Sequence, residues 1–291
     1  MNKYIFLIFT SLFITIVGLF TLIGTTTPAT LYVGEGSNGS FILIGDAVDA
    51  AIVGDTIIVK DGLYYENLII HTSALTIRSE NGSNLTIVQA ANPAEHVFEV
   101  TGDNVKIEGF TISGATEMSN AGVYVHAADY CEIYYNNISD NFNGIEIHSY
   151  GSRFVGNTVH SGMNYGIHLS NSNHNTFSRN IISNNRIGFR PYRSNKNNIY
   201  LNTFTENEKN IQIFESTNIF KPKKKISYIY NENTYSDYLG NKWSDYTGDD
   251  ENNDGIGDTP YFIGENNMDN HTVMPDFEIP KEVSKLDLSF F

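Results

Sequence analysis

Short stretches in which apolar and polar residues alternate recur along residues 121–213 at one fixed interval. Their first residues stand 22 positions apart, at Gly122, Gly144, Gly166, Gly188 and Asn210. A constant interval of about 20–50 residues is typical of repeat proteins, in which each repeat is one structural unit that stacks on the next. We therefore expect a repeat architecture for the middle of the chain.

The alternation within each repeat indicates β-strands. In Ile145-Glu146-Ile147-His148 every second residue is apolar, which is the period of a strand with one buried face. The strands are short and end at Asn, Gly, Ser or Asp, which favour turns. Equivalent strands recur in the same direction. Each repeat is therefore expected to form one turn of a coil whose strands pair in parallel with those of the next turn, about 4.8 Å away.

The predicted fold is all-β, a right-handed parallel β-helix with Val, Ile, Leu and Phe inside. A second phrase, apolar-x-x-Asn-x-apolar, precedes the later repeats and contains Asn136, Asn157, Asn180 and Asn202. We expect these asparagines to lie at tight corners, where side-chain amides can hydrogen-bond from coil to coil. A leucine-rich solenoid is the alternative repeat fold, but its Leu-x-x-Leu-x-Leu signature is missing.

Both ends of the chain depart from the repeat. Residues 45–54 are expected to form a short helix, with Asp46 near its N-cap, that covers the first coil. Beyond Phe214 the pattern loosens, and Trp243 is expected to pack over the last coil. We divide the chain into a signal peptide or signal anchor (1–24), a linker or lead-in (25–40), the β-helix (41–240), a C-terminal cap (241–277) and a tail (278–291).

Residues 1–24 have the composition of an export signal. Lys3 is followed by about twenty mostly apolar residues, which fits a cleaved signal peptide as well as an uncleaved anchor in a membrane. Either alternative places the rest of the chain outside the cytoplasm. Export would make sequons such as Asn137-Ile138-Ser139 candidate glycosylation sites.

The composition narrows the classes of partner. A net charge of −15 argues against nucleic acid and against anionic lipid. The only cysteine, Cys131, is expected to be a buried small apolar side chain, and a single cysteine excludes a disulfide within the chain.

The acidic segment 250–258 resembles the first part of a calcium-binding loop. Oxygen ligands stand at its first, third, fifth and ninth positions, a glycine stands at the sixth, and a backbone carbonyl would serve at the seventh. The candidate ligands are Asp250, Asn252, Asp254, Ile256 and Asp258. Tyr261 replaces the bidentate Glu at the twelfth position, so Asp249 or another residue would have to complete the shell. We expect structural Ca²⁺, and an Asp- and Asn-rich turn without an ion is the alternative.

The outward positions of the repeats form two columns. Because Ile145 and Ile147 point inward, Glu146 and His148 point outward. One column contains Tyr124, Glu146, His168, Arg190 and Gln212, and its neighbour contains His126, His148, Ser170, Tyr192 and Phe214. From these we select a candidate ligand-binding face consisting of Tyr124, His126, Glu146, His148, His168, Arg190 and Tyr192. Such a face suits sugar binding or metal capture by imidazole, and chance alignment of polar residues is the alternative.

Three parts of the sequence together resemble the NosD-type, copper-handling periplasmic β-helix proteins, including exported archaeal and bacterial forms. They are an opening segment (47–67), the 22-residue repeat, and a closing element formed by 240–246 and 254–261. The resemblance implies a right-handed β-helix and export, and in the named members a role in copper delivery. In the wider group with the same repeats it implies binding or processing of polysaccharide.

We expect an exported cell-surface protein that binds extracellular carbohydrate or a partner protein through the candidate face. A carbohydrate-active enzyme (lyase, epimerase or hydrolase) of the same fold is the first alternative, and a metal-delivery accessory protein is the second. No catalytic residue is assigned. Copper is not supported by the sequence, because the methionines are scattered and there is one cysteine.

Overall fold

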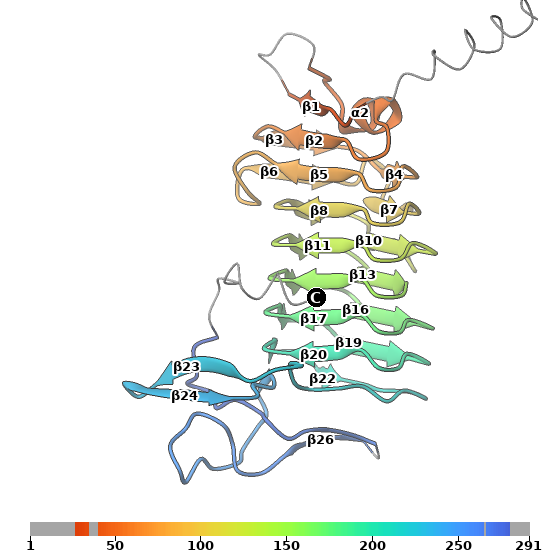
Figure 1. Ribbon diagram of the computed structural model, residues 1–291. Coiled ribbons are helices and arrows are strands. Elements are labelled where there is room, and N and C mark those ends of the chain that lie inside the picture. The colour runs from red at the N-terminus through yellow and green to blue at the C-terminus, as the bar shows by residue number, and fades with distance from the viewer. Residues whose placement is uncertain (1–26, 35–39, 265, 280–291) are drawn as a thin grey trace, which may run out of the picture.

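The computed structural model describes residues 27–34, 40–264 and 266–279. These residues form a parallel β-helix in which three sheets, A, B and C, run along the axis of one coil (Figure 1). The predicted signal segment 1–24 and most of the predicted tail lie outside the described residues. Within the described residues, no helix is both long and apolar enough to cross a membrane.

Each sheet takes one strand from each turn of the coil. Sheet A contains β1 (Thr30–Val33), β2 (Thr56–Val59), β5 (Thr76–Ser79), β8 (Lys106–Glu108), β11 (Glu132–Tyr134), β14 (Arg153–Val155), β17 (Thr176–Ser178) and β20 (Asn198–Tyr200). Sheet B contains β3 (Gly62–Tyr65), β6 (Thr86–Gln89), β9 (Thr111–Ser113), β12 (Asn137–Ser139), β15 (Thr158–His160), β18 (Ile181–Ser183), β21 (Thr203–Thr205) and β25 (Lys242–Trp243). Sheet C contains β4 (Leu68–Ile70), β7 (Phe98–Val100), β10 (Ala121–His126), β13 (Asn143–His148), β16 (Tyr165–Ser170), β19 (Ile187–Tyr192) and β22 (Lys209–Ile211).

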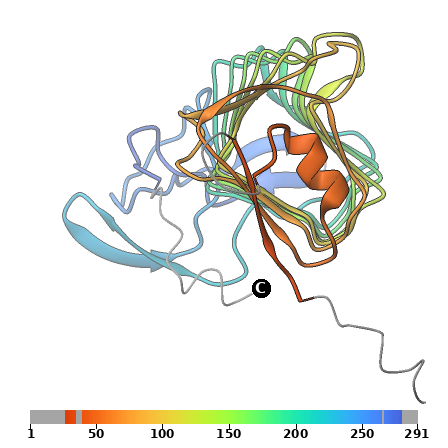
Figure 2. The same ribbon diagram turned by 90° about the horizontal axis from the view of Figure 1, so that it is seen from above.

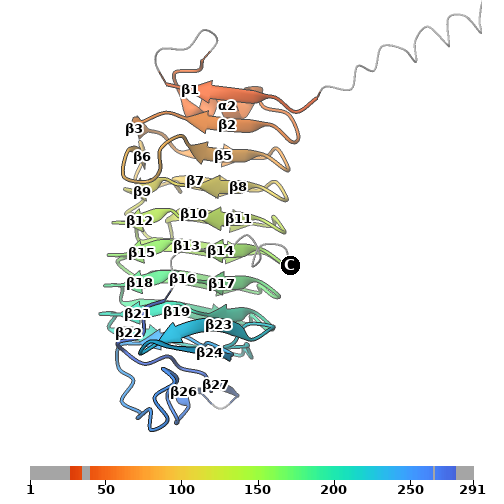
Figure 3. The ribbon, with the colours of Figure 1, turned by 60° about the vertical axis from the view of Figure 1, so that its left-hand side comes forward.

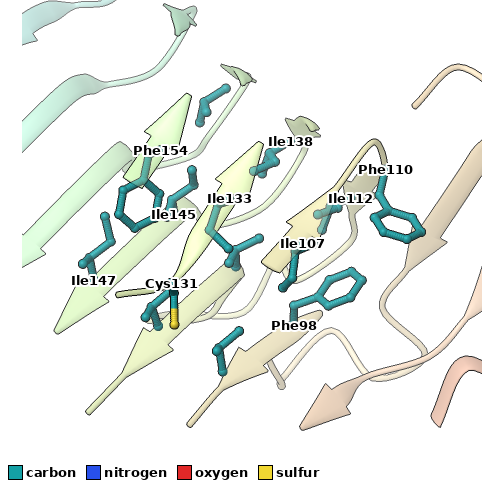
Figure 4. Close-up of a cluster of buried hydrophobic side chains, with 14 of the residues drawn as sticks. Phe98, Ile107, Phe110, Ile112, Cys131, Ile133, Ile138, Ile145, Ile147 and Phe154 are labelled. Carbon is teal, nitrogen blue, oxygen red and sulfur yellow. The ribbon is translucent and has the colours of Figure 1, made fainter. Parts of the chain in front are cut away.

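The predicted alternation of inward and outward residues is confirmed. Ile133 pairs with Ile107 on one side and with Phe154 on the other, so like residues stack from coil to coil. These side chains fill the interior of the coil together with Phe98 and Cys131 (Figure 4). All are fully buried, and the apolar area that they remove from water is the main favourable term in folding.

A ladder of asparagine side chains runs up one inner corner of the coil. The Asn157 Oδ1 atom accepts hydrogen bonds from the backbone N–H of Asn136 at 3.0 Å and from its side-chain amide at 3.2 Å. The Asn157 amide donates in turn to the carbonyl of Ile133 at 2.8 Å. The same contacts repeat along the Asn ladder, which contains Asn136, Asn157, Asn180, Asn202 and Asn241. The predicted corner positions are therefore confirmed.

The Asn ladder ends on a carboxylate. Asp269 accepts hydrogen bonds from the Asn241 backbone at 2.7 Å and from the Trp243 indole N–H at 3.1 Å. Burial raises the pKa of Asp269 to about 6 against the opposing effect of these bonds. A carboxylate accepts hydrogen bonds but has no N–H to donate. It suits the last position of the Asn ladder, because the described residues form no further coil that could accept such a bond.

The glycines that begin the repeat phrases are required by close packing between coils. A Cβ atom added to Gly166 would lie 2.6 Å from the carbonyl oxygen of Gly188 and 2.8 Å from the side-chain amide of Asn185. Any larger residue there would displace backbone of the next coil, which explains why the phrase begins with Gly.

The short helix α2 (Ile44–Ala50) covers the N-terminal end of the coil, as predicted (Figure 2). Asp46 lies in its first turn, but no side chain from the N-cap residue caps the helix. Glu66, from the turn after β3, does this instead and accepts from the backbone N–H groups of Ile44 and Gly45 at 2.8 Å each. The predicted place of Asp46 near the N-cap is confirmed, whereas the carboxylate that caps the helix comes from the next coil.

The coil extends beyond the predicted limits of 41–240 at both ends. Strand β1 lies within the segment that we interpreted as a linker and pairs in parallel with β2. At the other end β25 adds to sheet B, and Trp243 stacks between Phe204 and Tyr261 with ring centroids 4.3 and 4.4 Å away. The predicted packing of Trp243 over the last coil is confirmed.

Two antiparallel hairpins complete the C-terminal end. They are β23 (Ile226–Tyr230) with β24 (Asn233–Asp237), and β26 (Tyr261–Gly264) with β27 (Asn267–Asp269). The first hairpin is inserted between β22 and β25 and lies beside the coil (Figure 1). The basic loop 221–225 leads into β23, and its four lysines are exposed.

Candidate functional site

The candidate face lies on the outer side of sheet C. The register pairs Tyr124 with Glu146, Glu146 with His168, and His168 with Arg190, which gives the first predicted column. In the second column His126 pairs with His148, and Ser170 pairs with Tyr192. We call the set Tyr124, His126, Glu146, His148, His168, Arg190 and Tyr192 the polar strip. The structure brings all seven residues together.

Glu146 lies at the centre of the polar strip. Its Oε1 atom is 3.6 Å from His148 Nε2 and 3.7 Å from His168 Nδ1, and its Oε2 atom accepts from the Asn143 amide at 3.1 Å. Burial raises the pKa of Glu146, but the two imidazoles outweigh this effect and hold the pKa at about 2. The carboxylate is therefore ionised at neutral pH and fixes the orientation of both rings.

Aromatic rings continue the strip toward the N-terminal end. The ring centroids of His96 and Tyr124 are 4.4 Å apart, and those of Tyr124 and His126 are 5.1 Å apart. The Tyr124 hydroxyl and His126 Nδ1 are 2.7 Å apart, which is a hydrogen-bond distance. Burial lowers the pKa of His96, and its Nδ1 atom accepts from the backbone N–H of Ala121 at 3.0 Å. His96 thus lies next to the polar strip and extends it by one ring that the sequence did not reveal.

The other end of the strip is organised around Arg190. Its guanidinium group donates to Gln212 Oε1 at 2.7 Å and lies 5.4 Å from the centre of the Tyr165 ring. Tyr165 also packs against His168, with ring centroids 4.8 Å apart. Tyr165 was missed because it precedes the repeat phrase by one position. The same position in β13 is Asn143, which contacts Glu146, so the residue before each glycine was an available signal.

The predicted calcium loop forms a tight acidic turn. Asp250 accepts from the backbone N–H groups of Asp254 at 3.1 Å and Gly255 at 2.8 Å, and Asp258 accepts from the N–H of Glu251 at 2.7 Å. Side chains of the predicted ligands Asn252 and Asp254 bond to nearby backbone N–H groups, and Ile256 pairs with Val273. Calcium binding stays a prediction.

Across the described ranges, no group of three or more His, Cys, Asp or Glu side chains is arranged to hold a metal ion. Cys131 is fully buried, as predicted, and burial raises the pKa of its thiol to about 12. Its thiolate form is therefore negligible at neutral pH.

The sequence profile of one family, described as "Periplasmic copper-binding protein (NosD)", matches residues 48–248. No curated protein sequence gives a significant match to the chain. Among solved structures, ORF18 of Geobacillus virus E2 is similar at 17% identity and a TM-score of 0.52, covering 65% of this chain and 43% of that chain.

Other similar structures are polysaccharide-related proteins. Pectin methylesterase PemA from Erwinia chrysanthemi shares 13% identity at a TM-score of 0.48, covering 78% of this chain and 92% of its own. An alginate lyase from Paenibacillus sp. shares 14% identity at a TM-score of 0.44, covering 65% of this chain and 76% of its own. At these identities the likeness concerns the fold alone.

Proposed function

The chain belongs to the NosD family, and on this premise we propose that it is an exported β-helix protein that binds a glycan through the polar strip. The apolar segment 1–24 and the periplasmic description of the family both support export. The observation that carries the proposal is the strip itself, an uninterrupted run of rings and hydrogen-bonding groups from His96 to Arg190.

The chemistry of the strip matches that of a sugar chain. Aromatic faces such as Tyr124 and Tyr165 pack against C–H groups, while imidazole, carboxylate and guanidinium groups bond to hydroxyls. Glu146 accepts and Arg190 donates, so both kinds of hydroxyl contact are available. Equivalent side chains recur once per coil, about 4.8 Å apart, which suits a polymer whose own units repeat.

We expect Arg190→Ala to weaken glycan binding about tenfold, because Gln212 and Tyr165 hold Arg190 in place at one end of the polar strip. The measurement is affinity of the purified protein for a panel of neutral and acidic polysaccharides. Arg153→Ala is the matched control, because Arg153 is a half-buried arginine on the outer side of sheet A. Equal losses in the two variants would contradict the role of the strip.

Incubation of the purified protein with the same polysaccharides separates the alternative functions. Release of shortened chains or altered sugars would assign a carbohydrate-active enzyme in place of a binding protein. Metal delivery is the second alternative, and the family description names copper binding. It would rest on the imidazoles of His126 and His148, whose ring centroids are 5.7 Å apart. Copper or zinc binding that His126→Ala with His148→Ala abolishes would favour that function. Capture of a surface protein with no affinity for any glycan would make the strip a protein-binding surface.

A further inference from the structure

A trough with a volume of about 240 Å³ lies beside the polar strip, where sheet C turns toward sheet A. Figure 3 shows this corner, with β10 next to β11, β13 next to β14 and β16 next to β17. The trough is lined by His126, Ala127, Asp129, His148, Ser149, Tyr150, Ser170 and Asn171. It shares only two residues with the polar strip, so it extends the candidate surface around the corner.

Rings from two rows line the trough, namely His126 and His148 from one row and Tyr150 from the other. One row belongs to the strip and contains His126 and His148. The other row contains Tyr130, Tyr150 and His174, with successive ring centroids 5.9 and 5.0 Å apart. Both Tyr130 and Tyr150 are exposed.

Small side chains separate the two rows. In three successive coils, Ala127, Ser149 and Asn171 directly follow the outward residues His126, His148 and Ser170. Their short side chains leave the space between the rings open. A flat ring that entered the trough would therefore meet an aromatic face on one side and imidazoles on the other.

The trough presents polar atoms that the protein itself leaves unpaired. Asp129 Oδ1 accepts from the backbone N–H of Tyr150 at 2.8 Å, whereas Asp129 Oδ2 makes no hydrogen bond within the described residues. His126 contacts Tyr124 through Nδ1, and His148 contacts Glu146 through Nε2. Among the described residues, no hydrogen bond occupies the other nitrogen of either imidazole, so that nitrogen can bond to a ligand.

The charges around the trough select among sugars. Asp129 is adjacent to Asp103, whose carboxylate accepts from the Asp129 backbone N–H at 2.8 Å. Arg193, one coil further along, is paired with Glu215 at 2.7 Å. The net charge of the chain is −15. Carboxylates of a uronic acid chain would thus be repelled, whereas the hydroxyl of an uncharged sugar can donate to Asp129.

We propose that the trough binds one unit of an uncharged polysaccharide, with the C–H face of the sugar against Tyr150. Its hydroxyl groups bond to Asp129, His126 and His148. This inference rests on the proposed glycan-binding function, and it adds the position of a subsite and the class of sugar.

The test is isothermal titration of the purified protein, at low salt, with cellohexaose, laminarihexaose, mannohexaose and hexagalacturonate. At least one neutral hexasaccharide is expected to bind about tenfold or more tightly than hexagalacturonate. Tyr150→Ala should weaken that binding about tenfold, because it removes the ring and leaves the backbone N–H that bonds to Asp129. Tyr65→Ala, which removes an exposed tyrosine on sheet B, should leave the affinity unchanged.

Asp129→Asn gives a readout that a purely structural role would not produce. The substitution keeps an oxygen that can accept from Tyr150 and removes the charge, so affinity for hexagalacturonate should rise about threefold or more. Tighter binding of hexagalacturonate by the unaltered protein would overturn the inference. Loss of neutral-sugar binding in Arg190→Ala but not in Tyr150→Ala would also overturn it and leave the proposed function intact. If no oligosaccharide binds, both fail.

Discussion

Glu146 connects the two columns of the polar strip, because its carboxylate contacts His148 in one column and His168 in the other. The pKa of this group is about 2 in the folded protein, below its ordinary value of 4.5. The folded state therefore takes up the proton only at lower pH than the unfolded state does. The resulting contribution to stability is present above about pH 4.5 and is lost as the pH falls toward 2.

We expect Glu146→Gln to lower the free energy of unfolding by about 1–3 kcal/mol at pH 7, because it removes the ionised carboxylate that contacts both imidazoles. The difference from the unaltered protein should shrink as the pH falls and vanish near pH 2. Urea unfolding at several pH values measures both effects. Glu99→Gln is the control, since Glu99 lies two coils earlier in the same column and forms no ion pair within the described residues. A difference that persists at pH 2 would contradict the assignment.

At the scale of the structural elements, the Asn ladder matters for the corners of the coil, where it satisfies buried backbone groups. The strands are held mainly by their own parallel hydrogen bonds. Each strand is only a few residues long, and its hydrogen bonds resemble those of any parallel sheet. Where the coil turns, the asparagine of the adjacent coil satisfies buried backbone groups. Asn157 accepts from the N–H of Asn136 and donates to the carbonyl of Ile133. The ladder thereby fixes where each coil turns.

Adjacent asparagines provide a matched test of the ladder. Asn136 is buried, accepts from the Phe110 N–H at 2.9 Å and donates to the Ile107 carbonyl at 3.1 Å, whereas Asn137 points outward from β12. Asn136→Ala should lower the free energy of unfolding by about 2–4 kcal/mol, because it leaves buried polar groups unpaired. Asn137→Ala should change it by less than about 1 kcal/mol. Chemical denaturation of both variants measures their free energies of unfolding. Similar losses in the two variants would argue against a stabilising role of the Asn ladder.

At the scale of the whole molecule, stability depends on closing the ends of the coil. The helix α2 covers the first coil, and Trp243 with Tyr261 covers the last. The hairpin of β26 and β27 also supplies Asp269, on which the Asn ladder ends, and Asn267, which accepts from the backbone N–H of Asn218 at 2.9 Å. Capping units are required in solenoids because the terminal coils otherwise expose apolar core and unpaired strand edges.

The acidic loop belongs to this cap, so calcium should act on the stability of the whole coil. We expect excess Ca²⁺ to raise the melting temperature by about 5 °C or more relative to EDTA. Asp254→Ala should abolish this shift, because Asp254 is a predicted ligand. Asp237→Asn, in the neighbouring hairpin, should retain it. Thermal denaturation in Ca²⁺ and in EDTA is the measurement. Equal melting temperatures of the unaltered protein under the two conditions would contradict stabilisation of the cap by Ca²⁺.

The sequence by itself determined the coil and the two columns of the strip. With a period of 22 residues and apolar positions pointing inward, equivalent residues of successive coils lie next to each other. The partners of Glu146 and His148 therefore follow from counting 22 residues along the sequence. The asparagines at the corners followed from the phrase that precedes each repeat, at intervals of 21, 23 and 22 residues. The columns of the strip depend on position within the repeat, and that position is constant.

Only the tertiary structure decided the contacts that break the period. Tyr130, Tyr150 and His174 are separated by 20 and 24 residues rather than 22, because the turns between sheets C and A differ in length. His96 joins the strip from an irregular early coil, and Glu66 caps α2 from the adjacent coil. Turn length is set by how the corners pack in three dimensions, so counting along the chain cannot place these side chains.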